Sequence, residues 1–421
     1  MKKDCIHFLE KPKLRSLFLF LFLLGPFFSH AQITDLAAGT DWQRISYNGT
    51  YQDFKIPDDF VGVIYFRMFG GDGGFADAQQ DGSCLYKGGA GAEVYQELIV
   101  GDGDNEIPAG STIRFIIGGR GESQGTNGGA VIVYYCGGGG GGTGILAKIN
   151  DNWVILSTAG GGGGAYAKVF NGFCAQENRH GGSGVTSING ESVGDREGGV
   201  HGLGGQGPSS GKNGPGGGAF ADGYDYNQYE DTGKAGWFFI GGVGEPLGGK
   251  GGTSSTNLAK DGGFGFGGGG VGQESGGGGG GYSGGAASSH GGGGGSYVNE
   301  DYSVDHYLKE LPTTADVKDG FVQYRLEWKC RIGNTSVTID EAESCAGEGA
   351  TVTATIESTP PCATDLYYDL KDASNPDDLQ FVTSSNDGVF ENVGVGQYAI
   401  VVGNVAYGSM DTVTFAVNVA M

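Results

Sequence analysis

The sequence predicts an all-β protein in which glycine helices of the polyproline II type are inserted between strands. Three observations predict this class. Runs of consecutive glycines interrupt the chain, short segments rich in β-forming residues surround them, and no segment has the periodicity of an amphipathic α-helix. The runs are Gly137–Gly142, Gly160–Gly164, Gly216–Gly218, Gly267–Gly270, Gly276–Gly281 and Gly291–Gly295.

Glycine loses more backbone freedom on folding than any other residue, at a cost of roughly 0.5–1 kcal/mol relative to alanine in a regular element. A glycine run is therefore either disordered or packed in a way that only glycine allows. Aromatic and aliphatic residues lie near the run ends, which a flexible linker lacks, so we expect ordered packing, with disorder as the alternative. Polyproline II helices have three residues per turn and no internal hydrogen bonds, so bare glycine helices can pair their backbones with each other.

Residues 1–31 resemble a secretory signal peptide. A basic stretch from Lys2 to Arg15 precedes the apolar run 16–24, and Ser29-His30-Ala31 offers a cleavage site before Gln32. We therefore expect a secreted or outer-surface protein that is cleaved after Ala31, with no membrane insertion after cleavage. Six cysteines remain in the mature chain, and export favours disulfides among Cys84, Cys136, Cys174, Cys330, Cys345 and Cys362.

The length of the chain limits the number of domains, and its net charge limits the kinds of partner that it can bind. The 421 residues predict two or three domains. The formal net charge is −23, and removal of the signal peptide takes away five basic and two acidic residues, which leaves −26. This acidity argues against nucleic acid or an anionic membrane as a partner. It also keeps a glycine-rich exported protein in solution.

The elements of the glycine-rich part follow in chain order. Strands are expected over 40–70, 93–100 and 111–117, with a turn at Gly101–Glu106 between the last two. A hairpin is expected over 145–157 across Asn150–Asn152, and a strand with alternating apolar residues over 319–328. Residues 175–262 have weak periodicity and are expected to form a loop-rich insertion that offers a contact surface.

Several of these blocks resemble the extracellular glycine-rich domain of the anaplastic lymphoma kinase and leukocyte tyrosine kinase receptors. The blocks are Cys136–Gly164, Gly262–Gly270 followed by Gly276–Ala286, the leading strand Phe54–Gly74, and Phe115–Gly121. The resemblance covers about residues 45–328 and implies a tumour-necrosis-factor-like jelly roll with inserted left-handed polyglycine helices. In the receptors this region binds protein ligands, and the bacterial-style signal peptide indicates an exported bacterial relative. Kinase motifs are absent from the sequence.

Residues 329–421 differ in composition, because glycine falls and Val/Thr alternation rises. Strands are expected at 334–340, 350–356, 366–370, 380–382, 396–402 and 413–419, a spacing typical of a β-sandwich. Ser344–Gly347 and Gly388–Ile400 resemble the immunoglobulin-like repeats of bacterial surface adhesins. The expected organisation is thus a signal peptide (1–31), a glycine-rich jelly roll (32–328) and an immunoglobulin-like β-sandwich (329–421).

Motifs for catalysis and metal binding are weak. The pattern G-x-S-x-G recurs through composition alone at Ser123, Ser192, Ser209 and Ser283, and no helix is expected after any of them. Asp102, Asp104 and Glu106 have calcium-like spacing, but Ile113 stands where an EF-hand needs glutamate, so a hairpin turn is expected. We expect no catalytic residue, no cofactor and no metal site.

The function expected is that of a non-catalytic, exported binding or adhesion protein with a protein or glycan ligand at the cell surface. The candidate contact residues are aromatic side chains of the insertion, namely Tyr224, Tyr226, Tyr229 and Trp237, with core packing as the alternative. A structural matrix component without a specific ligand is the second hypothesis, and a secreted glycan-active hydrolase is the third. We also expect Gly→Val within Gly276–Gly281 to disturb packing far more than Gly→Ala within 207–217.

Overall fold

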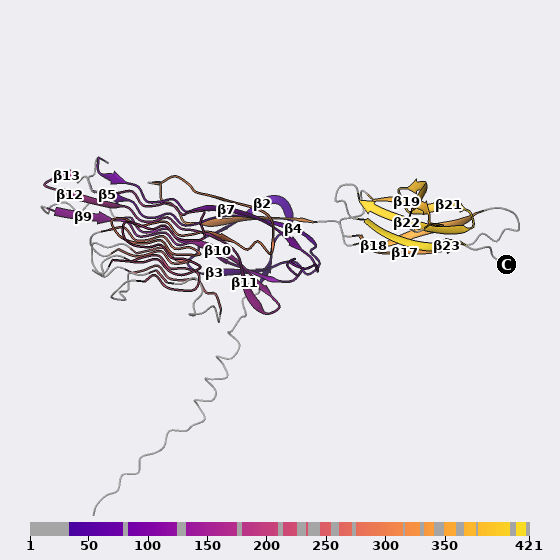
Figure 1. The fold of residues 1–421 in the computed structure, drawn as a ribbon, viewed down its shortest axis with the longest axis horizontal. Helices are drawn as coiled ribbons and strands as arrows, with labels where there is room; N and C mark the ends of the chain where they lie inside the picture. The colour runs from indigo at the N-terminus through magenta and orange to yellow at the C-terminus, as the bar shows by residue number, and fades with distance from the viewer. Residues whose placement is uncertain are drawn as a thin grey trace, which may run out of the picture. The chain divides into compact units, whose positions relative to one another are not determined.

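A computed structural model describes residues 33–421 except 79–82, 124–131, 175–178, 209–213, 225–232, 235–244, 254–260, 272–274, 315, 329–331, 341–348, 359–365, 376–377, 405–409 and 418–421. Within these residues every regular element is a β-strand, which confirms the all-β class (Figure 1). The predicted signal peptide lies outside the described residues.

Two sheets form the sandwich of the glycine-rich part. The first has the order β15-β7-β4-β16-β2, with β15 (Ser303–Lys309), β7 (Glu93–Val100), β4 (Gly62–Phe69), β16 (Phe321–Trp328) and β2 (Gly39–Ser46). The second has the order β1-β3-β8-β10-β11-β14, with β1 (Thr34–Asp35), β3 (Tyr51–Lys55), β8 (Thr112–Ile116), β10 (Thr143–Ile149), β11 (Asn152–Ala159) and β14 (Tyr297–Val298).

Alternation along the strands builds one core between these sheets. In β4 and β16 every second side chain is buried, as period-2 geometry requires. Phe66 of the first sheet meets Phe115 of the second edge to face, with ring centroids 5.8 Å apart. The two sheets therefore share a single hydrophobic core, an arrangement that fits the predicted jelly roll.

The glycine runs pack side by side as extended segments next to the sandwich (Figure 1). In the run Gly137–Gly142 every backbone N–H donates a hydrogen bond to another segment, with N···O distances of 2.7–3.0 Å. Two residues that are three positions apart donate to the same neighbouring segment. The acceptor segments are 162–165, 119–122 and 266–269. The six carbonyls of the run accept with the same period, from segments 71–74, 263–266 and 277–280.

A period of three with all hydrogen bonds made outward is the pattern of polyproline II helices. None of the run's glycines is among the described residues with positive φ, in agreement with this geometry. Glycine is required instead by close approach. A Cβ built at Gly139 would lie 2.0 Å from the carbonyl oxygen of Gly278, and one at Gly279 would lie 2.2 Å from that of Gly161. The predicted backbone-to-backbone packing is thus present.

The insertion 175–262 differs from the loop-rich surface expected for it. Described parts of it belong to the glycine array, because Gly182 donates to Gly291, Gly216 to Gly285 and Gly217 to Gly267 through their backbones. Sequence periodicity cannot reveal this role, because a glycine segment has no apolar side chains to alternate. The insertion therefore supplies scaffold as well as surface.

A small sheet caps one end of the glycine array (Figure 1). It has the order β13-β12-β9, with β13 (Phe173–Cys174), β12 (Tyr166–Phe170) and β9 (Ile132–Cys136), and lies beside the pair β5 (Ala76–Asp77) and β6 (Leu85–Tyr86). Its own core includes Ala76, Tyr135, Ala167 and Val169.

The C-terminal residues form a second sandwich with a separate core. One sheet contains β17 (Ile332–Asp340), β18 (Ala350–Ser358) and β21 (Val389–Val393). The other has the order β20-β19-β22-β23, with β20 (Gln380–Ser385), β19 (Leu366–Asp372), β22 (Gly396–Asn404) and β23 (Met410–Val417). Side chains of both sheets share one core, as a sandwich requires. Its immunoglobulin-like identity stays a prediction.

Candidate functional site

Of the four predicted aromatic contact residues, the structure describes only Tyr224. The Tyr224 side chain is 58% exposed, while its backbone donates to Gly205 and accepts from Gly207, both at 2.8 Å. Tyr226, Tyr229 and Trp237 lie outside the described residues. The exposed ring of Tyr224 agrees with a contact role, but the cluster of four stays a prediction.

One of the predicted disulfides is present within the glycine-rich part. Cys84 and Cys174 form it across 90 residues of sequence, and it joins the residue before β6 to the end of β13. Cys136, at the end of β9, is buried. Cys330, Cys345 and Cys362 lie outside the described residues, so any bridge that involves them stays a prediction.

The serines of the G-x-S-x-G matches have structural partners. The hydroxyl oxygen of Ser123 accepts a bond from the N–H of Phe75, that of Ser192 from Gly198, and that of Ser283 from Gly202, at 3.0–3.1 Å. Ser209 lies outside the described residues. These three hydroxyls therefore serve as acceptors for backbone N–H groups. Such a structural role is expected of serines whose G-x-S-x-G pattern arises from the high glycine content alone.

The acidic stretch after β7 forms the expected turn. Glu106 accepts a bond from the N–H of Gly103 at 2.8 Å, and the backbone of Ile107 returns to pair with Ile99 at 2.9 Å. No group of three or more His, Cys, Asp or Glu side chains suited to hold a metal ion occurs in the described part of the chain.

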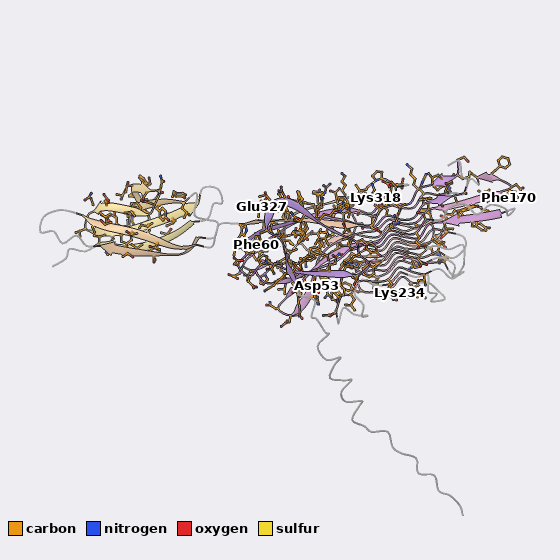
Figure 2. The ribbon with its side chains drawn as sticks, turned by 180° about the vertical axis from the view of Figure 1, so that it is seen from behind. Asp53, Phe60, Phe170, Lys234, Lys318 and Glu327 are labelled. Atoms are coloured by element: carbon orange, nitrogen blue, oxygen red, sulfur yellow. A yellow bond between two sulfur atoms is a disulfide. The ribbon has the colours of Figure 1, made fainter. Side chains whose placement is uncertain are left out.

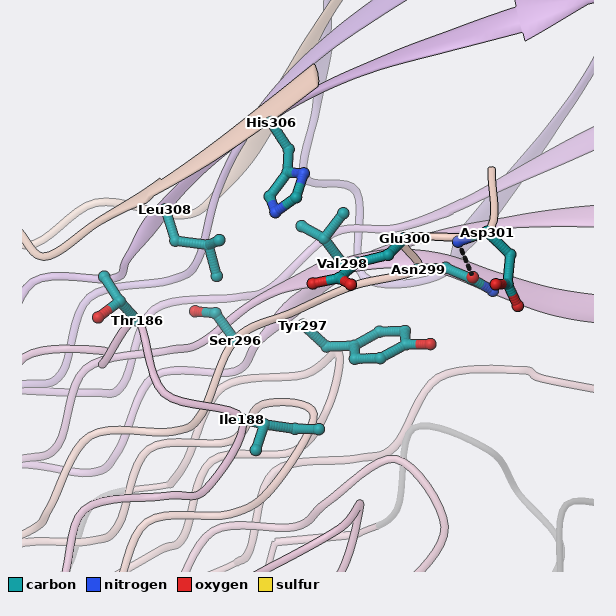
Figure 3. Close-up of a pocket in the computed structure, with 10 residues that line it drawn as sticks. All are labelled: Thr186, Ile188, Ser296, Tyr297, Val298, Asn299, Glu300, Asp301, His306 and Leu308. Carbon is teal, nitrogen blue, oxygen red and sulfur yellow. Dashed lines mark hydrogen bonds between the residues drawn. The ribbon is translucent and has the colours of Figure 1, made fainter. Parts of the chain in front are cut away.

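A polar hollow lies at the open edge of the sandwich, between the outermost strands β14 and β15 (Figure 3). His306 and Leu308 of β15 pair in register with Gln96 and Val94 of β7, whose side chains are buried in the sandwich. Directly opposite residues share a sheet face, so His306 and Leu308 face inward. Because β15 is an edge strand, the space beneath them stays open, with a volume of about 400 Å³.

Three segments that are distant in sequence line this hollow: 186–188 of the insertion, 296–301 around β14, and β15. Backbone bonds join the first two of these segments, because Val185 donates to Gly294 and Ser296 donates to Ser187, both at 2.9 Å, while β15 is held by its pairing with β7. Figure 3 shows His306 and Leu308 pointing from β15 toward Ser296 and Val298. The glycine array thus positions one wall of the site.

The hollow combines hydroxyl, carboxylate and imidazole groups with short apolar surfaces. Thr186 and Ser296 supply hydroxyls, the exposed Glu300 and Asp301 supply carboxylates, and Ile188, Val298 and Leu308 supply the apolar surfaces. Asn299 braces the turn, since its Oδ1 accepts from the N–H of Asp301 at 3.2 Å and its Nδ2 donates to the carbonyl of Ile155 at 3.3 Å (Figure 3).

Burial and negative charge shape the electrostatics of this site. The pKa of Tyr297 is raised, first by burial and then by Tyr282, Asp301 and Glu300. Its ring stacks on Tyr282 with centroids 4.3 Å apart, which fixes its orientation. The site therefore offers the uncharged phenol of Tyr297, the negative charges of Glu300 and Asp301 at its rim, and both donors and acceptors of hydrogen bonds.

Sequence reasoning missed this site. Its lining segments span more than a hundred residues, and no local pattern links 186–188 to 296–308. The acidic turn Asn299-Glu300-Asp301 was the one local signal, and it resembles many solvated turns.

No protein-family model and no curated protein matches this chain. Within the described residues, the structure contains no helix whose length and apolar character would let it cross a membrane.

Proposed function

We propose that this chain is an exported, non-catalytic binding or adhesion protein that holds a glycan in the hollow between β14 and β15. The observation that supports it most is the hollow itself, which gathers hydroxyls, carboxylates and apolar surfaces and has one wall held by the glycine array. The hydroxyl groups of a saccharide can hydrogen-bond to the hydroxyls and carboxylates of the hollow. The C–H faces of its ring can pack against the apolar surfaces. Ligand sites in proteins commonly combine apolar walls with a few placed polar groups.

The carboxylates of the hollow favour binding over hydrolysis. Glu300 and Asp301 are adjacent on one turn, whereas glycoside hydrolysis uses two carboxyl groups on opposite sides of the scissile bond. Two neighbouring carboxylates on one wall instead suit hydrogen bonds from the hydroxyl groups of one sugar. The expected partner is a glycan of a cell surface rather than a nucleic acid.

Export is part of the proposal. The signal-like N-terminus supports it, and so does the disulfide Cys84–Cys174, because disulfides persist in oxidising compartments. N-terminal sequencing of the protein recovered outside the cell is expected to begin at Gln32.

The binding proposal is tested by screening the mature chain on a glycan array and measuring the affinity of any hit by calorimetry. Glu300→Gln should weaken binding by roughly tenfold or more, because it removes a charged hydrogen-bond acceptor. Glu310→Gln is the matched control, since Glu310 is exposed but does not line the hollow. Absence of any glycan ligand, or equal losses in the two variants, would contradict the proposal.

A structural role without a specific ligand is the second candidate. The extent of the glycine array favours it, because outward backbone hydrogen bonds stiffen many segments at once. A mature chain that assembles into sheets or fibres and binds neither glycan nor protein would support this candidate instead.

A further inference from the structure

Two exposed phenylalanines form the tip of the hairpin β12–β13. Phe170 is 50% exposed and Phe173 is 77% exposed. They lie directly opposite each other across a two-residue loop, so their rings lie on the same side of the hairpin. Figure 2 shows Phe170 at the end of the glycine-rich part that lies away from Phe60 and Glu327. A paired apolar surface on a protrusion usually marks an interaction site.

The tip is rigid. The loop residues Asn171 and Gly172 have φ of 50° and 81°, as a tight type I′ turn requires. The disulfide Cys84–Cys174 binds the hairpin at the residue next to Phe173, and Val169, opposite Cys174, packs into the small core. The rings are therefore held outward by a stapled hairpin, and little conformational freedom is lost when they bind.

Polarity changes step by step away from the tip. Lys168, two residues before Phe170, lies on the same face and pairs in register with Tyr134, with its ammonium 5.7 Å from the tyrosine ring centroid. Tyr166 follows on that face and is buried. Phenylalanine outermost, then lysine with tyrosine, is the order that a lipid interface favours, because tyrosine and lysine sit at head-group level.

Charge does not oppose contact with lipid at this end. Among the described residues of segments 76–87 and 166–180, one acidic residue, Asp77, stands against three basic residues, Lys87, Lys168 and Arg179. Charges farther away than about 8–10 Å are largely screened at physiological salt. The acidity of the mature chain, which argued against an anionic membrane, therefore has little influence at the tip.

We propose that the Phe170–Phe173 hairpin docks on the surface of a lipid bilayer, with both rings inserted at the boundary between head groups and acyl chains. The contact is shallow and is driven by apolar burial, so it does not need anionic lipid. It is separate from the glycan site, and it would let the glycine-rich scaffold hold a membrane and a ligand at the same time.

The test is co-sedimentation of the full mature chain with phosphatidylcholine vesicles, with and without added phosphatidylserine. The wild-type chain should bind both kinds of vesicle, with little dependence on salt. Phe170→Ser and Phe173→Ser should each lower the partition coefficient by roughly tenfold, because each removes one buried aromatic side chain. Phe381→Ser is the matched control, since Phe381 is 62% exposed on β20 and should leave binding unchanged.

Folding of the variants is checked by the persistence of the Cys84–Cys174 disulfide and by unchanged circular dichroism. Failure of the wild-type chain to bind vesicles would overturn the proposal. The two phenylalanines would then be assigned to contact with a pocket of a partner protein. Binding that requires phosphatidylserine, or tip variants that bind as the wild type does, would overturn it equally. None of these outcomes depends on whether the hollow takes a glycan.

Discussion

A single methyl group added inside the glycine array would collide with backbone rather than with a movable side chain. At Gly279 the new Cβ would lie 2.2 Å from the carbonyl oxygen of Gly161. We expect Gly279→Ala to destabilise the glycine-rich part by about 3 kcal/mol or more, because the hydrogen-bonded neighbour must shift. Gly394→Ala is the control, since a Cβ there would come no closer than 3.9 Å to a neighbouring side chain, the hydroxyl of Tyr398, and it should leave the melting temperature unchanged.

The same geometry bears on the glycines within 207–217. From the sequence, alanine within 207–217 is expected to disturb packing far less than valine within Gly276–Gly281. A Cβ at Gly216, however, would lie 2.0 Å from the carbonyl oxygen of Gly279, and one at Gly217 would lie 2.4 Å from that of Lys234. These two glycines belong to the array, so alanine there should be as damaging as at Gly279. Calorimetric melting of Gly216→Ala beside Gly394→Ala measures this.

Glu93 gives the glycine-rich part an acid-sensitive contact. Burial tends to raise the pKa of its carboxyl, but hydrogen bonds from Arg67 and Tyr307, together with the positive charges of Arg67 and Lys309, outweigh burial and hold the pKa below its usual value. A lowered pKa in the folded state adds stability above the unfolded value of about 4.3, and this stability is lost as the pH falls through the folded pKa.

Glu93→Gln should therefore cost about 1–3 kcal/mol at neutral pH and much less in acid. Asp72 and Glu191 have raised pKa values, chiefly through burial, and act in the opposite direction, but both remain in the variant and cancel from the comparison. Urea unfolding of the two proteins from pH 7 down to pH 3 tests the prediction. A stability difference that stays constant across that range would contradict it.

At the scale of elements, the disulfide Cys84–Cys174 is expected to stabilise the cap of the glycine array. It closes a loop of 90 residues, and constraint of the unfolded chain over such a loop contributes about 2–5 kcal/mol. Cys84→Ser with Cys174→Ser should lower the melting temperature of the glycine-rich part and leave the C-terminal sandwich unchanged. Equal shifts of both transitions in calorimetry would contradict a local role.

Elements with local patterns were predictable from sequence, and those defined by distant contacts were not. The expected strand 93–100 coincides with β7, and the expected 319–328 contains β16, because alternation is a property of the segment itself. The hairpin β12–β13 was not predicted, although Asn171-Gly172 is a strong turn signal. Its strands are too short to show a clear alternation of apolar and polar residues. The glycine run that precedes them has no side chains with which to extend that alternation.

At the scale of the whole molecule, hydrogen-bond partners rather than side-chain patterns define the glycine array. The sequence indicated that the runs would pack backbone to backbone, but it gave no rule for which run lies beside which. Within segment 277–280, for example, two backbone N–H groups donate to the run that contains Gly137 and Gly140. The other two donate to the separate segments that contain Gly214 and Gly292. The hollow between β14 and β15 depends on this order, so it could not be predicted either.

The array makes a prediction about exchange of backbone amides. Every N–H from Gly277 to Gly281 donates to another backbone segment, at 2.8–3.2 Å. These amides should exchange as slowly as those of β4, because release requires opening of several segments at once. The turn Asp102–Asn105 is exposed and supplies the fast reference in the same experiment. Hydrogen exchange read by mass spectrometry distinguishes the two rates. If 277–281 exchanges like that turn, the glycine segments are not a rigid support, and the hollow that they position loses its physical basis.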